Sequence, residues 1–247
     1  MIKIEHVVLP SAEQMDFIIE GMRNPMNSWE KSDSFCKPST ENCCGCHDYN
    51  KCAYIFESTG KPHRGDIGPN DFDLMKRLRN AGTEHRKYLR MMTVYARITA
   101  PLYWWKEFDT YKVGTVANSC STMHKIMDKE FVKEDFSLGE FLAGEDWVDV
   151  TLNELNELRD TYNRFDEYKS NGCLVDGVTK KDVWYMLIQI LPNSYNQTRN
   201  VMMNYEVLAN IYRQRKDHKL DCWRDFCAWI ETLPYSYLIT GEDNTTR

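Results

Sequence analysis

The sequence predicts an α+β fold, because stretches with helical spacing are many and strand-like stretches are few. Apolar residues recur every three or four positions in several long stretches, which is typical of helices that bury one face. Alternating or β-branched runs occur around residues 2–8, 90–99 and 197–203. The chain has 247 residues, of which 42% are hydrophobic and 13% aromatic, so we expect one globular domain, 1–247, with a substantial core.

The N-terminal part is expected to begin with a strand and a helix. Residues 2–8 alternate as a short strand does, and the helix that follows is expected to start at Ser11. Gln14 stands three positions after Ser11, which is the spacing of a capping box. Helical spacing returns close to residue 70, where we take Asn70 as the N-cap and Gly82 as the residue that ends the helix.

The middle of the chain is expected to form a strand and then a short helix. Residues 90–99 alternate and are β-branched, and Pro101 is expected to end this strand. Residues 102–108, LYWWKEF, are expected to start a helix. We interpret their aromatic rings as core, with a stacking wall for a planar ligand as the alternative.

The C-terminal half is expected to be mainly helical, starting with a helix over residues 151–170. One face of that helix collects apolar residues: Leu152, Leu155, Leu158 and Tyr162. A second helix is expected to begin at Thr179 and to end before Pro192. A strand over 197–203 is followed by one long helix or two over 204–231.

A cysteine-rich segment, residues 31–68, lacks periodicity and is interpreted as an insertion. Loops of this length usually need a function or a metal to hold them. Four cysteines follow a C-x6-C-x2-C-x5-C pattern: Cys36, Cys43, Cys46 and Cys52, with Cys44 and His47 as spare ligands. Four such thiolates can form a tetrahedral structural zinc site. Free thiols and an iron–sulfur cluster are the alternatives.

The charge and hydropathy of the chain exclude some classes of partner. The net charge of −6 is the opposite of the basic surplus of a general nucleic-acid binder, so no nucleic-acid partner is expected. No apolar run approaches the roughly 18 residues of a membrane-spanning helix, so no membrane span is expected. The N-terminal residues show no signal-peptide pattern, and we expect a cytoplasmic protein.

One polar stretch, TYKVGTVANSCSTMHK at residues 110–125, contains no acidic residue and is expected to be a loop. Lys112, Ser121 and Thr122, together with successive backbone amides, can bind a phosphate. His124 can add a charge that depends on protonation.

The same stretch also has structural interpretations. Tyr111 and Met123 can pack into the core while the remaining residues cap a turn. Cys120 is interpreted as an ordinary half-buried thiol, with a nucleophile as the alternative.

Two segments carry motifs in a recognisable order. Residues 180–231 contain Leu-Pro, then a strand, then a set of polar and aromatic residues: Asn204, Asn210, Arg215, His218 and Trp223. The stretch GTEHRKYLRMMTVYARITAP places Glu-His before a strand. This pattern resembles the flavin-dependent thymidylate synthases, the ThyX family. The resemblance covers roughly residues 68–125 and 180–231, about half of the chain.

The chain departs from the family's most diagnostic motif, Arg-His-Arg followed after seven residues by Ser. Its nearest counterpart starts at residues 110–112, and with a one-residue insertion Asn118 and Ser121 match the family's Asn and Ser. Met123 and Ile188 stand where the family has anion-binding arginines. The chain therefore resembles a divergent branch of the family, of the phage type.

The resemblance implies a small, mainly antiparallel sheet with flanking long helices, in a homotetramer whose subunits share active sites. It implies that dUMP is methylated to dTMP, with FAD as cofactor, methylenetetrahydrofolate as carbon donor and NADPH as reductant. A folate and a pyrimidine deoxynucleotide are the partners that follow.

The resemblance also implies roles for individual residues. The catalytic residues would be Arg215 and Ser121. The FAD-binding residues would be Glu84, Asn204, Asn210 and Arg215. The nucleotide-binding residues would be Lys112, Asn118, Ser121, Thr122 and Arg215. An arginine suits the pyrimidine, because its planar fork of donors can polarise a carbonyl.

Two further functions stay open. The same fold and flavin can act on another pyrimidine nucleotide, such as dCMP. Alternatively, the chain can be a non-catalytic descendant that keeps the fold for nucleotide binding or protein interaction, which the missing arginines favour.

Overall fold

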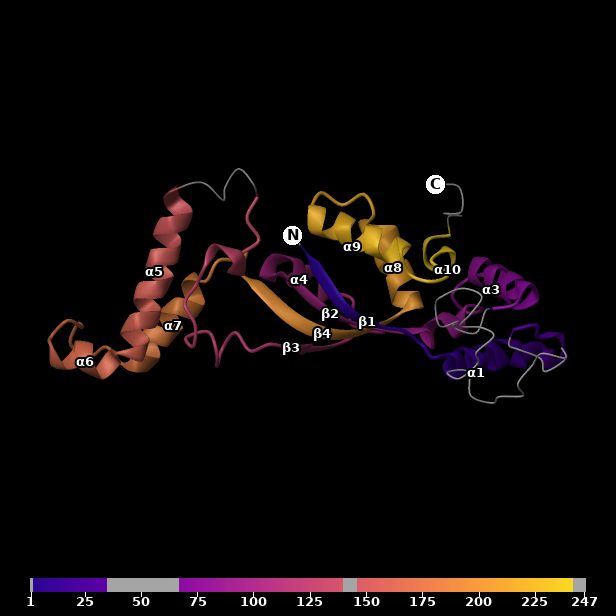
Figure 1. The fold of residues 1–247 in the computed structure, drawn as a ribbon, viewed down its shortest axis with the longest axis horizontal. Coiled ribbons are helices and arrows are strands. Elements are labelled where there is room, and N and C mark those ends of the chain that lie inside the picture. The colour runs from indigo at the N-terminus through magenta and orange to yellow at the C-terminus, as the bar shows by residue number, and fades with distance from the viewer. Residues whose placement is uncertain (1, 35–66, 140–145, 242–247) are drawn as a thin grey trace, which may run out of the picture.

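The computed structural model describes residues 2–34, 67–139 and 146–241 (Figure 1). Its centre is a four-stranded sheet in the order β1-β2-β4-β3, formed by β1 (Lys3–Val8), β2 (Thr93–Pro101), β3 (Val116–Ser119) and β4 (Asn196–Asn204). Every neighbouring pair is antiparallel. The α+β class and the small antiparallel sheet are therefore confirmed.

The strands alternate between a buried face and an open face. Val94, Ala96 and Ile98 of β2 and Val201 of β4 are buried, whereas Tyr95 is 50% exposed. Figure 1 shows the buried side covered by α4 (Leu102–Phe108), α8 (Tyr205–Arg215) and α9 (Asp221–Glu231). This alternation is what a sheet with one face on the core requires.

The remaining helices stand at the two ends of the sheet (Figure 1). At one end lie α1 (Ala12–Arg23), α3 (Pro69–Ala81) and α10 (Tyr237–Thr240). At the other end lie α5 (Asp146–Asn163), α6 (Phe165–Ser170) and α7 (Lys180–Ile190). Short 3-10 turns are η1 (Asn24–Met26), η2 (Trp29–Lys31), η4 (Lys87–Arg90) and η5 (Lys133–Asp135).

Two hydrophobic cores follow from this arrangement. The larger one joins the sheet to α1, α3, α4, α8 and α9, and Trp104, Trp105 and Trp223 are fully buried in it. The core interpretation of residues 102–108 is therefore confirmed. The smaller core joins Leu155 of α5 and Leu187 of α7 to residues 126–136, with Leu152, Leu158 and Tyr162 packed against it. The apolar face predicted for this helix is confirmed.

Local capping signals predicted two helix starts correctly. Ser11 accepts a hydrogen bond from Gln14 N, and the Gln14 side chain accepts one from Ser11 N. Thr179 and Asp182 form the same reciprocal box at α7. The predicted helix over 151–170 is instead two helices, because α5 ends at Asn163 and α6 begins at Phe165.

The prediction that Asn70 caps the second helix is wrong. Helix α3 begins at Pro69, with Gly68 as its N-cap residue. The carboxylate of Asp33 accepts hydrogen bonds from Asn70 N at 2.9 Å and Asp71 N at 3.1 Å. A side chain from 37 residues earlier thus serves the α3 terminus, so no local signal was needed there.

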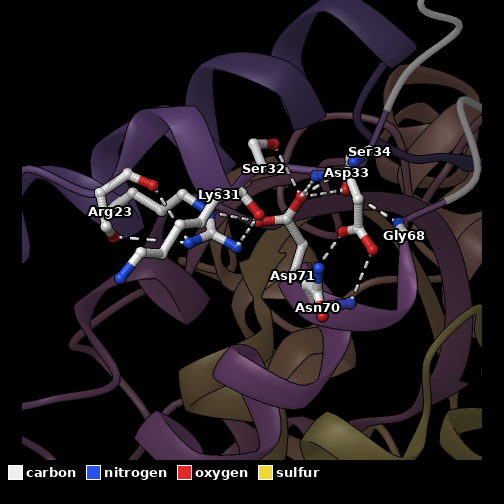
Figure 2. Close-up of polar contacts among 9 residues, drawn as sticks. Arg23, Lys31, Ser32, Asp33, Ser34, Gly68, Asn70 and Asp71 are labelled. Carbon is white, nitrogen blue, oxygen red and sulfur yellow. Dashed lines mark hydrogen bonds and ion pairs between the residues drawn. The ribbon is translucent and has the colours of Figure 1, made fainter.

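The ends of the described chain around the cysteine-rich segment are joined by a buried polar cluster, which we call the Asp71 cluster (Figure 2). Asp71 Oδ2 accepts hydrogen bonds from Ser34 N, Ser34 Oγ and Ser32 Oγ, and Oδ1 accepts one from Arg23 Nε at 2.5 Å. Ser34 Oγ also accepts a hydrogen bond from Gly68 N at 2.9 Å. The chain therefore leaves and re-enters this region at one fixed point.

The hydrogen bonds of the Asp71 cluster offset the cost of burying the charges of Asp71 and Arg23. The Asp71 side chain is fully buried and that of Arg23 is 5% exposed. Burial raises the pKa of Asp71, but hydrogen bonds from Ser34, Ser32 and Arg23 outweigh it and hold the pKa below its usual value. Gly68 is needed at the junction, since a Cβ there would overlap Asp33.

Candidate functional site

Arg215, the predicted catalytic arginine, is held by three side chains at the C-terminal end of α8. Its Nη1 lies 2.8 Å from Glu107 Oε2, and its Nε donates to Tyr111 Oη at 2.8 Å. The guanidinium carbon lies 4.8 Å from the centroid of the Trp223 ring, a cation–π distance. The arginine therefore has a fixed orientation and a carboxylate partner within the chain.

Glu107 is the hub of this group, which we call the Arg215 cluster: Glu107, Tyr111, Arg215, His218 and Trp223. Glu107 Oε2 also accepts a hydrogen bond from Trp223 Nε1 at 2.8 Å, and His218 Nε2 lies 3.6 Å away. Only 18% of the Arg215 side chain is exposed. The sequence pattern found Arg215, His218 and Trp223 but did not single out Glu107, whose role depends on the packing of α4 against α8 and α9.

Asn204 serves as the N-cap of α8. Its Oδ1 accepts a hydrogen bond from Val207 N at 2.9 Å, and the residue is 9% exposed. Gly114 passes directly over it with φ +90°, and a Cβ on Gly114 would lie 2.9 Å from Asn204 Nδ2. The predicted ligand loop therefore crosses the N-terminus of α8, although the oxygen of Asn204 is already used by the helix.

Asn210 lies half a helix further along α8. Its Oδ1 accepts hydrogen bonds from Gln214 Nε2 at 2.8 Å and Arg213 Nη2 at 3.1 Å. Eleven residues separate Asn204 from Arg215, which is about 16 Å along a helix axis. The three residues predicted to contact FAD on α8 thus extend over the whole helix rather than converging on one point.

The predicted loop 110–125 contains strand β3, so its assignment as a loop throughout is wrong. The four residues of β3 pair with β4 at the edge of the sheet, and none of their side chains is buried. Asn118 faces Asn200 across this pair, and Asn200 faces Arg97 on β2. Lys112 and Ser121 lie on either side of β3, and Lys112 is exposed.

The end of this stretch forms a capped turn. Ser121 Oγ accepts hydrogen bonds from His124 N at 3.0 Å and from Met123 N at 3.3 Å. Thr122 is half-buried. Cys120 is exposed, so its interpretation as a half-buried thiol is wrong. Tyr111 packs in the core as the structural alternative required, whereas Met123 is 43% exposed. The hydroxyl of Ser121 is therefore engaged by its own backbone.

Glu84, the acidic residue predicted near the flavin, lines a pocket of about 1150 Å³. Its walls come from the end of α1, from α3 and from residues 84–91. Arg23, Ser32 and Asp33 of the Asp71 cluster form part of the same wall. The junction in Figure 2 thus shapes the pocket that contains Glu84.

A buried ion pair links this region to α8. Arg86 Nε lies 2.8 Å from Glu206 Oε2, and both side chains are 18% exposed. Tyr205 N also donates to Met92 O at 3.0 Å, next to the start of β2. The segment after Glu84 is therefore fixed to the first turn of α8.

The described residues contain neither a metal-binding cluster nor a membrane-spanning helix. In residues 2–34, 67–139 and 146–241, no three His, Cys, Asp or Glu side chains are grouped so that they could hold a metal ion. The predicted zinc ligands Cys36, Cys43, Cys46 and Cys52 lie outside the described residues, and that site stays a prediction. No helix in the described part has the length and apolar character of a membrane-spanning segment.

Comparisons with known proteins bear on the fold. No protein-family model matches the chain, and no curated protein sequence matches it. The structure is similar to thymidylate synthase X (ThyX) of Helicobacter pylori crystallised with FAD and dUMP, with a TM-score of 0.58, 14% identity, and coverage of 98% of each chain. A second structure of the flavin-dependent thymidylate synthase ThyX of that organism, also with FAD and dUMP, matches with a TM-score of 0.57 and 16% identity. The match covers 97% of this chain and 98% of the other. The chain therefore has a ThyX-like fold.

Proposed function

We propose that this protein is an FAD-dependent thymidylate synthase, which methylates dUMP to dTMP with methylenetetrahydrofolate as carbon donor and NADPH as reductant. The observation that carries the proposal is the match over 98% of both chains to an enzyme crystallised with FAD and dUMP. The order of Glu84, Asn204, Asn210 and Arg215 along the chain supports it independently of the structure. Fold alone does not fix function, so the side chains must supply the rest.

The pocket beside Glu84 supports a flavin. Its volume of about 1150 Å³ lies just above the roughly 300–1,000 Å³ that is usual for small-molecule sites. Lys31 and Lys87 line it with ammonium groups and Ser28 with a hydroxyl, which can bind the phosphates of a dinucleotide. The same pocket is also lined by carboxylates, namely Glu30, Asp33, Glu84 and Asp73, and Asp73 pairs with Arg77 at 2.9 Å. When bound, FAD supplies the electron transfer that the chain's own residues cannot carry out.

Arg215 is the residue we assign to the pyrimidine. Ion pairing with Glu107 and contact with Tyr111 and Trp223 fix its guanidinium before any ligand arrives, which is the property required of a preorganised donor. The second terminal nitrogen of Arg215, Nη2, makes no hydrogen bond with another described residue. In this proposal it donates a hydrogen bond to a uracil carbonyl oxygen. Ser121 and Lys112 are assigned to the nucleotide phosphate, with Asn118 and Thr122 as supporting contacts.

We further propose that the protein is a homotetramer. The open face of the sheet supports assembly, because Tyr95 is 50% and Val116 is 62% exposed there. Light scattering coupled to size exclusion tests this directly: a monomer at micromolar concentration would contradict it.

A non-catalytic nucleotide-binding protein is the second candidate, and two observations favour it. Glu107 already neutralises Arg215, and the Ser121 hydroxyl is occupied by the turn that follows it. A ligand must compete with both contacts before it can use these residues.

Flavin spectroscopy and product analysis separate the candidates. Purified full-length protein incubated with FAD should bind it, and NADPH should bleach the bound flavin. Addition of methylenetetrahydrofolate and dUMP should then yield dTMP, with dCMP as the comparison substrate. FAD binding without turnover on either nucleotide would support the non-catalytic candidate. Metal analysis of the same sample tests zinc, since a folded, metal-free protein would exclude the Cys36–Cys52 site.

A further inference from the structure

A chain of side-chain hydrogen bonds connects Arg215 to Asn210, and we call it the Tyr111–Gln214 relay. Arg215 Nε donates to Tyr111 Oη at 2.8 Å, and Tyr111 Oη donates to Gln214 Oε1 at 3.1 Å. Gln214 Nε2 then donates to Asn210 Oδ1 at 2.8 Å. The relay therefore joins the residue assigned to the pyrimidine to a residue assigned to FAD.

The direction of donation in the relay is fixed at both ends by arginines, whose side chains donate hydrogen bonds and accept none. Tyr111 accepts from Arg215, so its one hydroxyl proton is directed to Gln214 Oε1. The other end of the Gln214 amide is then its nitrogen, which requires an oxygen on Asn210. Arg213 Nη2 lies 3.1 Å from the same Asn210 oxygen and requires an acceptor there as well. The network therefore determines the orientation of both amides.

This orientation makes Asn210 a hydrogen-bond donor toward any ligand beside it. Its Oδ1 accepts from both Gln214 and Arg213, whereas its Nδ2 makes no hydrogen bond with another described residue. The residue is partly exposed. An asparagine amide without such partners can turn over and present its oxygen instead. A ligand that contacts Asn210 must therefore supply an acceptor, such as a carbonyl oxygen or a ring nitrogen.

The two middle residues of the relay act through their neighbours. Tyr111 is 7% exposed and packs edge-on against Trp223, with 6.0 Å between the ring centroids, so its hydroxyl has a fixed position. Gln214 is exposed, but both ends of its amide are used within the relay. Because Gln214 bonds to Tyr111 and Asn210 and not to Arg215, its effect on Asn210 can be separated from the role of the arginine.

We propose that Tyr111 and Gln214 are positioning residues, which hold the Asn210 amide with its nitrogen toward FAD and tie it to Arg215. FAD then accepts a hydrogen bond from Asn210 Nδ2. This inference rests on the proposed function, because FAD is the ligand assigned to Asn210. The relay sets the orientation of the donor before the ligand arrives, as a preorganised site requires.

Calorimetric titration of the full-length protein with FAD tests the relay. Gln214→Met removes the amide but keeps an unbranched side chain at an exposed position, so the fold should persist. Its dissociation constant for FAD should rise roughly 3- to 10-fold, the effect of one hydrogen bond. In Asn210→Ala, the same change at Gln214 should have no further effect, because Gln214 acts only through Asn210.

Asn210→Asp tests the polarity of the contact. The carboxylate keeps an acceptor for Gln214 and Arg213 but offers no donor to the ligand. We expect this variant to bind FAD at least as weakly as Asn210→Ala does. FAD binding by Asn210→Asp that equals that of the unmodified protein would overturn the proposal.

Gln189→Met is the matched control, since it makes the same change at an exposed glutamine of α7, outside the relay. It should bind FAD as the unmodified protein does. Equal losses of affinity in Gln189→Met and Gln214→Met, or additive losses at Asn210 and Gln214, would overturn the proposal. The expected coupling without dTMP formation would uphold the relay while refuting the proposed reaction. No FAD binding by the unmodified protein would refute both.

Discussion

Asp71→Asn should destabilise the protein strongly, because it removes one charge from a buried ion pair. Asp71 is fully buried, Arg23 is 5% exposed, and the two atoms in contact are 2.5 Å apart. Breaking a buried pair by removing one partner typically lowers the free energy of unfolding by about 3–5 kcal/mol. The asparagine amide would also present a donor to Arg23 Nε if its oxygen kept the contacts with Ser32 and Ser34.

Urea unfolding followed by tryptophan fluorescence measures this loss. A decrease of about 3–5 kcal/mol corresponds to a melting temperature lower by roughly 6–20 °C for a chain of this size. Asp73→Asn is the matched control, two residues further along α3, where the pair with Arg77 is exposed on both sides at 58% and 69%. Its effect should stay below about 1 kcal/mol. Equal effects of the two variants would refute our reasoning about the Asp71 cluster.

The same carboxylate predicts a pH dependence. The pKa of Asp71 in the folded protein lies below its unfolded value, so its contribution to stability is fully present above about pH 4. That contribution should fall as the pH decreases from about 4 through the folded pKa. In Asp71→Asn this part of the acid sensitivity should disappear, which a series of urea titrations between neutral and acidic pH would reveal.

Five further variants test other parts of the structure. Arg215→Ala should lower dTMP formation by about 10²-fold or more while the circular dichroism spectrum is unchanged, and full activity in this variant would show that the arginine is structural. Glu107→Gln should tighten dUMP binding, because it removes the carboxylate that competes for Arg215. Thr179→Ala should lower the free energy of unfolding by about 1 kcal/mol through loss of the capping box, as measured by urea unfolding. Gly68→Ala should lower the melting temperature, because a Cβ there overlaps Asp33. Gly21→Ala has open space around it and should stabilise α1 by about 0.5–1 kcal/mol. A higher melting temperature for Gly68→Ala than for Gly21→Ala would contradict the geometry at Gly68.

Sequence reasoning predicted those elements whose signals are local. The capping residues Ser11 and Thr179 are next to the helices they start, and the apolar face of α5 repeats at helical spacing. Strand β3 was missed because it is four residues long, lies at the edge and buries no side chain, so it has no alternation to detect. The cap of α3 was misassigned because Asp33 supplies it from a distant part of the chain.

In the candidate site, too, the sequence predicted residues with a local motif but not the contacts that depend on tertiary packing. Motif spacing predicted Arg215 and Asn204, but it did not predict that Glu107 would hold the arginine or that the asparagine oxygen would cap α8. Those contacts depend on how α4, α8 and the stretch before β3 meet, which no single segment encodes.

FAD-dependent dTMP formation is the most direct test of the proposed function. Purified protein should be combined with FAD, NADPH, methylenetetrahydrofolate and dUMP, and the nucleotide products separated by chromatography. We expect dTMP to accumulate only when all four are present and to disappear in Arg215→Ala. A protein that binds no FAD and forms no dTMP would contradict the proposal, leaving a ThyX-like fold without the ThyX reaction.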